Sequence, residues 1–409
     1  MINIRVLATV FALAAATPVL HAQAAPEPVG FAAAEGDGLS TTTGGAGGAV
    51  VTASSFEELV ELVARAEPLV IEVAGTISGS GMVRLASDKT LIGRGSDAVL
   101  AGFGLHIAGR QNIIIRNLSF TGADDDAINV QDSSHHIWID HCDLAGAHDG
   151  LIDIKRGSSW ITVSWNHFHD HEKTCLLGHS DDNREEDTGR LKVTYHHNWF
   201  ERTKSRHPRA RFGQCHVFNN FYDRVSDYGV ASTEDAEVLV EANHFLGVGE
   251  PTLVGYAASG PGELIETANL FVGSGAPETA GEVFDPTAHY AYAADPAADV
   301  PAIVREGAGV SGFAAPAAAA FARGDANSDG AIDIGDPVTI LADTLGGDRL
   351  ECRKAADANA DGDVSIADAV YALQFLFTRG PAPDAPFPGC GVGPATSELS
   401  CERYDRCSR

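Results

Sequence analysis

Six side chains between residues 126 and 211 have the types and spacing to bind and act on an anionic polymer. They are three carboxylates and three bases, found in GADDDAINV, HDGLIDI, HDHEKTCLLG and KSRHPRARFG: Asp126, Asp149, Asp153, Lys173, Arg206 and Arg211. Three carboxylates brought to one point repel each other unless a cation joins them. An all-oxygen ligand set favours Ca²⁺ over Zn²⁺ or copper. Asp124 is a further acidic position in the same segment as Asp126, and any one of these Asp residues standing alone would be read as a turn cap.

The basic residues are densest in the segment from Lys204 to Tyr222, KSRHPRARFGQCHVFNNFY. Read as a strand, positions 207, 209 and 211 share one face, and Pro208 breaks the ladder near position 206. Such a bend would aim Arg206 and Arg211 into one groove. The alternative is a solvated basic strand that makes surface ion pairs.

The overall charge makes this basic segment unusual. The chain has 28 Lys and Arg against 56 Asp and Glu, so its net charge is −28, which argues against non-specific binding to nucleic acid or anionic membranes. Nine of the cationic residues nevertheless fall between Lys173 and Arg211. A local basic patch on an acidic protein predicts a specific anionic ligand.

The first 24 residues have the pattern of a secretory signal peptide. Arg5 precedes an apolar run from Val6 to Ala16, and Ala22-Gln23-Ala24 forms a small-residue cleavage site. The run is shorter than the roughly 20 residues of a membrane span, and no later stretch has that length and apolarity. We therefore expect an extracellular protein.

Export permits disulfides, and the seven cysteines fall into two groups. Cys352, Cys390, Cys401 and Cys407 lie near the end of the chain and are expected to pair among themselves. The other three are an odd number, so at least one thiol in the main body stays free.

Short apolar runs separated by Gly, Asp, Asn and Ser extend from Val50 to Gly273, with one helical patch at Phe56 to Arg65. Five asparagines each precede an aromatic residue by two positions, 22 to 32 residues apart: Asn166, Asn198, Asn220, Asn243 and Asn269. A repeat of this length without crossover helices predicts an all-β solenoid, best fitted by a right-handed parallel β-helix over residues 25–306. Stacked Asn side chains would hydrogen-bond from turn to turn. A β-sandwich with coincidental spacing is the alternative.

An Ala- and Gly-rich linker is expected at 307–323, followed by a second domain at 324–380 and a Pro- and Cys-rich tail at 381–409. The second domain contains two segments with oxygen side chains at loop positions 1, 3, 5, 9 and 12 and Gly at position 6, the spacing that wraps around Ca²⁺. The ligand positions are Asp325, Asn327, Asp329, Asp333 and Asp336 in the first loop, and Asp357, Asn359, Asp361, Ser365 and Asp368 in the second.

This pair of loops, each with an apolar segment after it, resembles a type I dockerin. The resemblance covers roughly Gly324 to Gly380 and implies a small α-helical calcium-binding domain that docks onto a cohesin-type protein partner. The alternative is a purely structural cap stabilised by calcium.

The main body is similar to pectate lyases of polysaccharide lyase family 1. Between about Gly44 and Gly275 the motifs of that family occur in order: GGAGG, KTLIGRG, NIIIRNLSF, WIDHCDL, DGLIDI, VSWNHF, KTCLLG, TYHHN, SRHPRARFG and HVFNN. The resemblance implies a pectin lyase-like solenoid. It also implies catalytic Ca²⁺ on Asp126, Asp149 and Asp153, with Asp124 as a weaker extra ligand. Arg206 is implied as the base, and Lys173 and Arg211 as binders of the substrate carboxylate.

The implied reaction is β-elimination on de-esterified homogalacturonan (polygalacturonate), giving 4,5-unsaturated oligogalacturonates. Because arginine side chains normally have pKa values of about 12 or above, an arginine base predicts activity at alkaline pH. Two alternatives remain: a pectin lyase acting on methylated pectin without metal, and a non-catalytic polysaccharide-binding β-helix. A polygalacturonase would instead need paired carboxylates and no arginine base. We expect a monomer.

Overall fold

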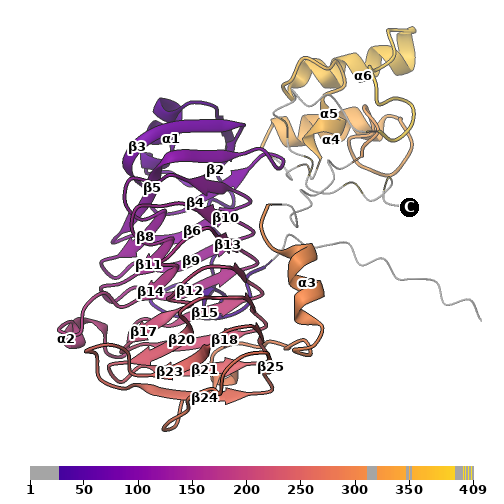
Figure 1. Cartoon of the computed structure of the whole chain (residues 1–409). Helices are drawn as coiled ribbons and strands as arrows, with labels where there is room; N and C mark the ends of the chain where they lie inside the picture. The colour runs from indigo at the N-terminus through magenta and orange to yellow at the C-terminus, as the bar shows by residue number, and fades with distance from the viewer. Residues whose placement is uncertain are drawn as a thin grey trace, which may run out of the picture.

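The computed structural model describes residues 27–310, 320–346, 350, 352–391, 399, 401, 404 and 407. The predicted signal peptide, residues 1–24, lies outside this part of the chain. From residue 49 to residue 272 the chain winds into a parallel β-solenoid, whose stacked turns run from the indigo to the salmon end of Figure 1. The predicted all-β solenoid is confirmed.

The solenoid wall is built from two sheets whose named strands pair only in parallel, and long strand β5 joins two runs of strands in the second sheet. The first sheet consists of β1 (Ala49–Ala53), β2 (Leu69–Val73), β4 (Lys89–Gly93), β6 (Gln111–Arg116), β9 (His135–Asp140), β12 (Ser159–Ser164), β15 (Val193–His196), β18 (Gln214–Phe218), β21 (Glu237–Glu241) and β24 (Glu263–Thr267).

The second sheet has two runs of strands that meet at β5, which we call the site run and the side run. The site run consists of β3 (Thr76–Arg84), β5 (Val99–Ala108), β8 (Ile128–Gln131), β11 (Ile152–Ile154), β14 (Cys175–Leu177), β17 (Arg209–Arg211), β20 (Tyr228–Thr233) and β23 (Glu250–Val254). The side run, which also begins at β5, consists of β7 (Ser119–Thr121), β10 (Asp143–Ala145), β13 (His167–His169), β16 (Trp199–Glu201), β19 (Phe221–Asp223), β22 (His244–Leu246) and β25 (Leu270–Val272).

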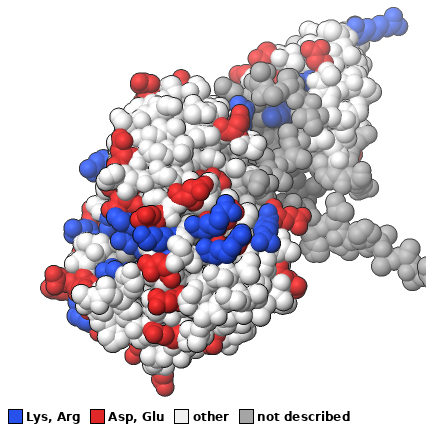
Figure 2. Space-filling view, in the orientation of Figure 1, with Lys and Arg blue, Asp and Glu red and all other residues white. Residues whose placement is uncertain are grey.

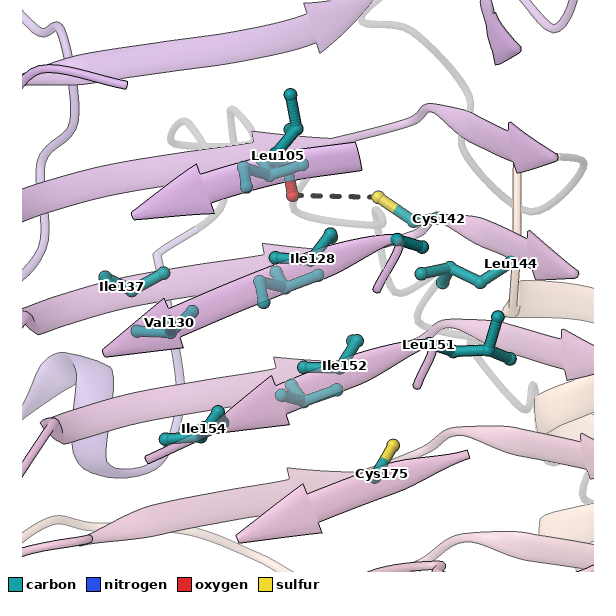
Figure 3. Packing of buried hydrophobic residues seen from close by; sticks show 14 of the residues in the cluster. Leu105, Ile128, Val130, Ile137, Cys142, Leu144, Leu151, Ile152, Ile154 and Cys175 are labelled. Atoms are coloured by element: carbon teal, nitrogen blue, oxygen red, sulfur yellow. Dashed lines mark hydrogen bonds between the residues drawn. The ribbon is translucent and has the colours of Figure 1, made fainter. Parts of the chain in front are cut away.

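Inward-facing side chains of successive turns stack into ladders that fill the solenoid. Figure 3 shows this for Ile128, Ile152 and their neighbours, which lie one above the next because strands β8 and β11 pair in register at these two residues. Aromatic rings stack in the side run, with ring centroids 5.0 Å apart for Phe168 and Phe200 and 4.3 Å apart for Tyr222 and Phe245. A continuous apolar core of this kind stabilises a solenoid in which each turn contacts only its neighbours.

The predicted asparagine ladder is confirmed. Asn198 Oδ1 accepts from the backbone N–H of Asn166 at 3.0 Å and from its Nδ2 at 3.1 Å, and Asn220 Oδ1 accepts from Asn198 in the same way. The pattern continues through Asn243 to Asn269. These amides satisfy polar groups at the turn into the side run, which would otherwise be buried without partners.

Short helices cover the solenoid. Helix α1 (Phe56–Ala64) confirms the helical patch predicted from the sequence; Ser55 caps it by accepting from Glu58 N–H, and Leu59 and Val63 extend the core at the N-terminal end (Figure 1). Helix α3 (Val300–Gly307) packs Val300 and Val304 against the side run. The remaining short helices are η1 (Phe31–Ala33), α2 (Arg184–Asp187) and η2 (Pro286–Ala288).

The C-terminal part is helical, with α4 (Gly335–Thr344), α5 (Arg353–Ala356) and α6 (Ile366–Thr378). Ile340, Val364 and Ala369 belong to its small apolar core. Much of the predicted linker, residues 311–319, lies outside the described residues, and Phe321 and Ala322 pack inside the C-terminal part. The domain boundaries remain predictions.

The cysteine pairing follows the expectation from the sequence. Cys352 is bonded to Cys401, and Cys390 to Cys407. Cys142, Cys175 and Cys215 are all free and buried in the solenoid, and Cys142 Sγ lies 3.8 Å from the carbonyl oxygen of Ile115 (Figure 3).

None of the helices in the described residues is long and apolar enough to cross a membrane.

Candidate active site

The site run places the predicted residues on consecutive turns. Asp126 lies just before β8, Asp149 and Asp153 lie before and within β11, and Lys173 lies just before β14. Arg206 and Arg211 lie before and at the end of β17. Because β8, β11, β14 and β17 are neighbours in the sheet, segments up to 85 positions apart come together at one edge.

A carboxylate cluster forms at this edge from Asp125, Asp126 and Asp149, whose oxygens lie within 4.8 Å of one another. Asp125 was missed in the sequence, where Asp124 was preferred as the extra ligand. Asp124 points elsewhere and accepts a hydrogen bond from Gly81 N–H at 2.9 Å. In a run of three Asp residues only the turn geometry decides which carboxylate enters the cluster.

Asp153 lies beneath this cluster and is buried. Burial, and then the neighbouring charge of Asp126, raises the pKa of Asp153 to about 7. Its Oδ1 atom has no hydrogen-bond partner among the described residues, and a Cβ atom at Gly150 would lie 2.2 Å from that oxygen. An unpartnered buried oxygen beside further carboxylates fits a cation.

Lys155 is a second residue that the sequence did not bring forward. Its Nζ lies 3.5 Å from Asp126 Oδ2 and 3.8 Å from Asp153 Oδ2, so it supplies positive charge within the acidic cluster. It is two residues after Asp153 in GLIDIKRG, and strand alternation from Asp153 would have placed it on the same face.

Lys173 contacts the cluster from the next turn. Its Nζ donates to Asp149 Oδ1 at 2.7 Å, and both side chains are about half exposed, at 46% and 45%. The hydrogen bond and charge of Lys173 lower the pKa of Asp149. The pair therefore lies at the solvent surface, where a ligand can reach both groups.

Arg206 is half-buried and adopts a left-handed backbone conformation, with φ of 66°. Among the described residues, no hydrogen bond or ion pair holds its guanidinium, although its charge acts on Asp149 and Asp153.

The neighbouring His207 fixes this segment from inside the solenoid. Its Nδ1 donates to the carbonyl of Tyr228 at 2.9 Å, so Nε2 is the acceptor for the hydroxyls of Thr174 (3.1 Å) and Thr203 (2.8 Å). Complete burial lowers the pKa of His207 to about 4. A neutral imidazole thus links the backbones that carry Lys173 and Arg206.

Arg211 differs from its neighbour because it is buried and already has partners. Its Nε donates to Asp181 Oδ1 at 2.6 Å and its Nη1 to the carbonyl of Gly178 at 2.8 Å. Strand β17 begins only at Arg209, after the bend at Pro208, so the expected shared face holds for positions 209 and 211 but not for His207.

A depression of about 520 Å³ adjoins Asp149 and Lys173. It is lined by Gly146, Ala147, His148, Asp149, Asp170, His171, Glu172, Lys173, Arg202, Lys204 and Ser226. Figure 2 shows lysines and arginines gathered in a band across the middle of the solenoid, with acidic side chains among them. The predicted local basic patch is therefore present on the acidic protein.

The comparison with known proteins agrees with this geometry. The family model for pectate lyase matches residues 3–296. The chain belongs to the pectate lyase family and is a polysaccharide lyase.

Several pectate lyases are similar to the chain. It is 43% identical to pectate lyase plyB of Emericella nidulans over 53% of this chain and 68% of that protein. It is 41% identical to the pectate trisaccharide-lyase of Thermotoga maritima over 72% of this chain and 91% of that protein. The crystal structure of a Bacillus pectate lyase in complex with trigalacturonate superposes with a TM-score of 0.63 and 30% identity, covering 69% of this chain and 99% of that one.

Proposed function

We propose that this pectate lyase cleaves polygalacturonate by calcium-dependent β-elimination with Arg206 as the base, giving 4,5-unsaturated oligogalacturonates. The observation that carries the proposal is the placement of the carboxylate cluster beside Lys173 and a guanidinium without a described partner. The trigalacturonate bound to the similar Bacillus enzyme supports a de-esterified substrate.

The residues present fit a calcium ion. Asp125, Asp126 and Asp149 offer only oxygen ligands, and Asp153 adds a buried oxygen without a described partner. The chemistry that bound Ca²⁺ supplies is neutralisation of the substrate's C6 carboxylate, which makes the adjacent C5–H bond more acidic.

The chain's own residues then have distinct tasks. Lys173 exchanges Asp149 for the substrate carboxylate and stabilises the negative charge that grows there. Neutral Arg206 accepts the C5 proton, the C5–H electrons form the C4–C5 double bond, and the C4–O4 bond breaks. The O4 leaving group then takes up a proton from water. Because the guanidinium must be neutral to accept a proton, turnover rises with pH. Arg211, which we assign to a substrate carboxylate, is held by Asp181 and has to exchange that partner for the substrate.

The test is ultraviolet absorbance of unsaturated uronate on polygalacturonate, with Ca²⁺ added and then chelated. We expect a signal at alkaline pH that disappears with chelator. The matched variant combines Asp329→Ala with Asp361→Ala, which removes a predicted calcium ligand from each C-terminal loop. If chelator lowers the activity of this variant as it lowers that of the unmodified chain, the calcium that matters for activity binds to the solenoid. A chelator-indifferent signal on methylated pectin alone would indicate a pectin lyase, and no signal on either would indicate a binding protein.

We also propose that the protein is secreted. The signal-peptide pattern of residues 1–24 supports this, and so do the two disulfides of the C-terminal part, because disulfides persist in oxidising compartments. Export of the full chain to the medium, with a new N-terminus at Ala25 by mass spectrometry, is the expected result. Retention of Met1 on a cytoplasmic product would contradict it.

For the C-terminal part we propose calcium binding at both loops. In the second loop the carboxylate oxygens of Asp357, Asp361 and Asp368 lie within 4.8 Å of one another. Gly330 and Gly362 make the sharp turns at loop position 6, with φ of 95° and 90°. Helices α4 and α6 follow the two loops, as a loop-helix repeat requires.

The same repeats present a candidate docking face for a cohesin-type protein. Ile334 and Ile366 both occupy position 10 of their repeat and are 53% and 54% exposed. Val338 and Val370 occupy position 14 and are 59% and 46% exposed. Exposed apolar residues that repeat at equivalent positions favour a protein partner, with either repeat able to make the contact.

We expect calcium-dependent binding of the full chain to an immobilised cohesin domain. The double variant Ile334→Asp with Ile366→Asp should lose it, whereas Val60→Asp, at an exposed apolar position on α1, should not. Calcium binding without cohesin binding would leave the structural-cap interpretation.

A further inference from the structure

The side run carries a cluster of two imidazoles and three carboxylates that the proposed reaction does not use. Asp143 on β10 is the register partner of His167 on β13, and Glu201 on β16 is the register partner of His169. His167 and His169 are two positions apart on one strand, so their side chains leave the same face. Asp170 follows at the end of β13.

The inner nitrogens of both imidazoles face one carboxylate. His167 Nδ1 lies 3.0 Å from Asp143 Oδ2, and His169 Nε2 lies 3.0 Å from Asp143 Oδ1. One ligand atom from each of these residues lies within 4.8 Å of the other two. Ligands of a tetrahedral zinc ion lie about 3.3 Å apart, because each is about 2.0–2.1 Å from the metal.

The outer nitrogens each have a carboxylate of their own. His167 Nε2 lies 3.0 Å from Glu201 Oε2, and His169 Nδ1 lies 2.8 Å from Asp170 Oδ2. Histidines that bind metal usually donate their second N–H to a carboxylate or carbonyl, which fixes the ring and its tautomer. The His167 ring is held further by stacking on Trp199, with centroids 4.3 Å apart.

We propose that Asp143, His167 and His169 form a binding site for a divalent transition metal of the zinc class, with Glu201 and Asp170 orienting the two imidazoles. Two imidazole nitrogens and one carboxylate suit such an ion, whereas the all-oxygen cluster of the site run suits Ca²⁺. The metal joins β10 to β13 across two turns, just before the chain leaves β13 for Lys173.

The experiment is calorimetric titration of the full-length chain with ZnCl₂ in buffer that contains excess Ca²⁺, so that the oxygen-ligand sites are occupied. We expect one saturable zinc site per chain. Asp143→Asn and His167→Gln should each weaken binding at least tenfold, and Glu201→Gln, which changes only an orienting carboxylate, about 10- to 100-fold. His106→Gln, which alters a half-buried imidazole on β5, is the matched control and should bind zinc like the unmodified chain.

A second readout uses Co²⁺ in place of zinc. The unmodified chain should give a visible d–d absorption band that is absent in Asp143→Asn, an isosteric change whose metal-free unfolding midpoint is measured as a folding control. The proposal is overturned if no zinc site saturates, or if Asp143→Asn binds zinc and cobalt unchanged. The cluster is then a hydrogen-bond network only.

Discussion

Lys173 Nζ donates to Asp149 Oδ1 at 2.7 Å although 24 positions separate the two residues, because they lie on adjacent turns of the solenoid. The lysine thus pairs with a carboxylate, the same group that a uronate of the substrate carries. Exchange of one carboxylate for another keeps the charge of the pair balanced.

Replacement of this lysine tests the exchange. Lys173→Gln should lower kcat/KM on polygalacturonate by about 10²- to 10³-fold, the usual effect of losing a group that stabilises developing charge. Initial rates from absorbance measure it. Lys204→Gln is the matched control, because Lys204 lines the same depression and pairs with Glu172 at 3.3 Å; an equal loss in both variants would contradict a specific role.

The base is tested by Arg206→Lys. We expect substrate binding within a few-fold of the unmodified enzyme, measured by calorimetry at neutral pH, and kcat lower by about 10²- to 10⁴-fold. Arg156→Lys, at an exposed arginine 3.9 Å from Glu186, should leave kcat unchanged. Full turnover in Arg206→Lys would show that another group takes the proton.

Substitution of Asp124 and of Asp125 tests which of the two carboxylates binds calcium. Asp125→Asn removes a carboxylate from the cluster, so the Ca²⁺ concentration for half-maximal activity should rise about tenfold. Asp124→Asn changes only a side chain that accepts from Gly81 N–H, so its effect should be much smaller. The reverse order would support the sequence-based choice of Asp124.

His207 predicts a loss of stability in acid. Its pKa in the folded protein is about 4, below the usual value near 6.5, so between these values the unfolded chain binds more protons. The free energy of unfolding should therefore fall as pH drops from about 6.5 to 4, by up to about 3 kcal/mol from this residue. Urea titrations at several pH values measure it. His207→Asn should reduce the dependence of the free energy of unfolding on pH.

The asparagine ladder predicts that the free energy of unfolding lost on substitution depends on the position of the asparagine in the ladder. Asn198→Ala leaves buried groups of Asn166 and Asn220 and the carbonyl of Val163 without their partner, so we expect a loss of at least about 3 kcal/mol. Asn269→Ala, at the half-buried end of the ladder, removes fewer contacts and should cost less. Chemical denaturation of both variants compares them; equal losses would contradict a cooperative ladder.

The ladder was also the part of the fold that could be predicted best. The spacing of Asn166, Asn198 and their repeats reflects one structural unit per turn, so the pattern is local and visible in the sequence. The carboxylate cluster was predictable in outline, because Asp126 and Asp149 belong to recognisable motifs. The details of the site could not be predicted. The conformation of a turn sets the direction of the Asp125 side chain, and the partner of Arg211 lies on another segment.

Arg211 shows this limit most clearly. Its acceptor Asp181 lies in the loop after β14, 30 positions earlier, and no periodic pattern marks that loop. The sequence predicts that Arg211 shares an open groove with Arg206, whereas in the structure Arg211 is buried. A resemblance between motifs can assign such a residue a role but not its resting partner.

The cysteine distribution divides the molecule into two redox classes. Cys142, Cys175 and Cys215 are buried in the solenoid, and burial raises the pKa of each thiol, so thiolate is scarce and exchange is slow. The two disulfides lie wholly in the C-terminal part. We therefore expect a mild reductant to break the two disulfides of the C-terminal part without changing the activity of the solenoid, whose three cysteines form no disulfide.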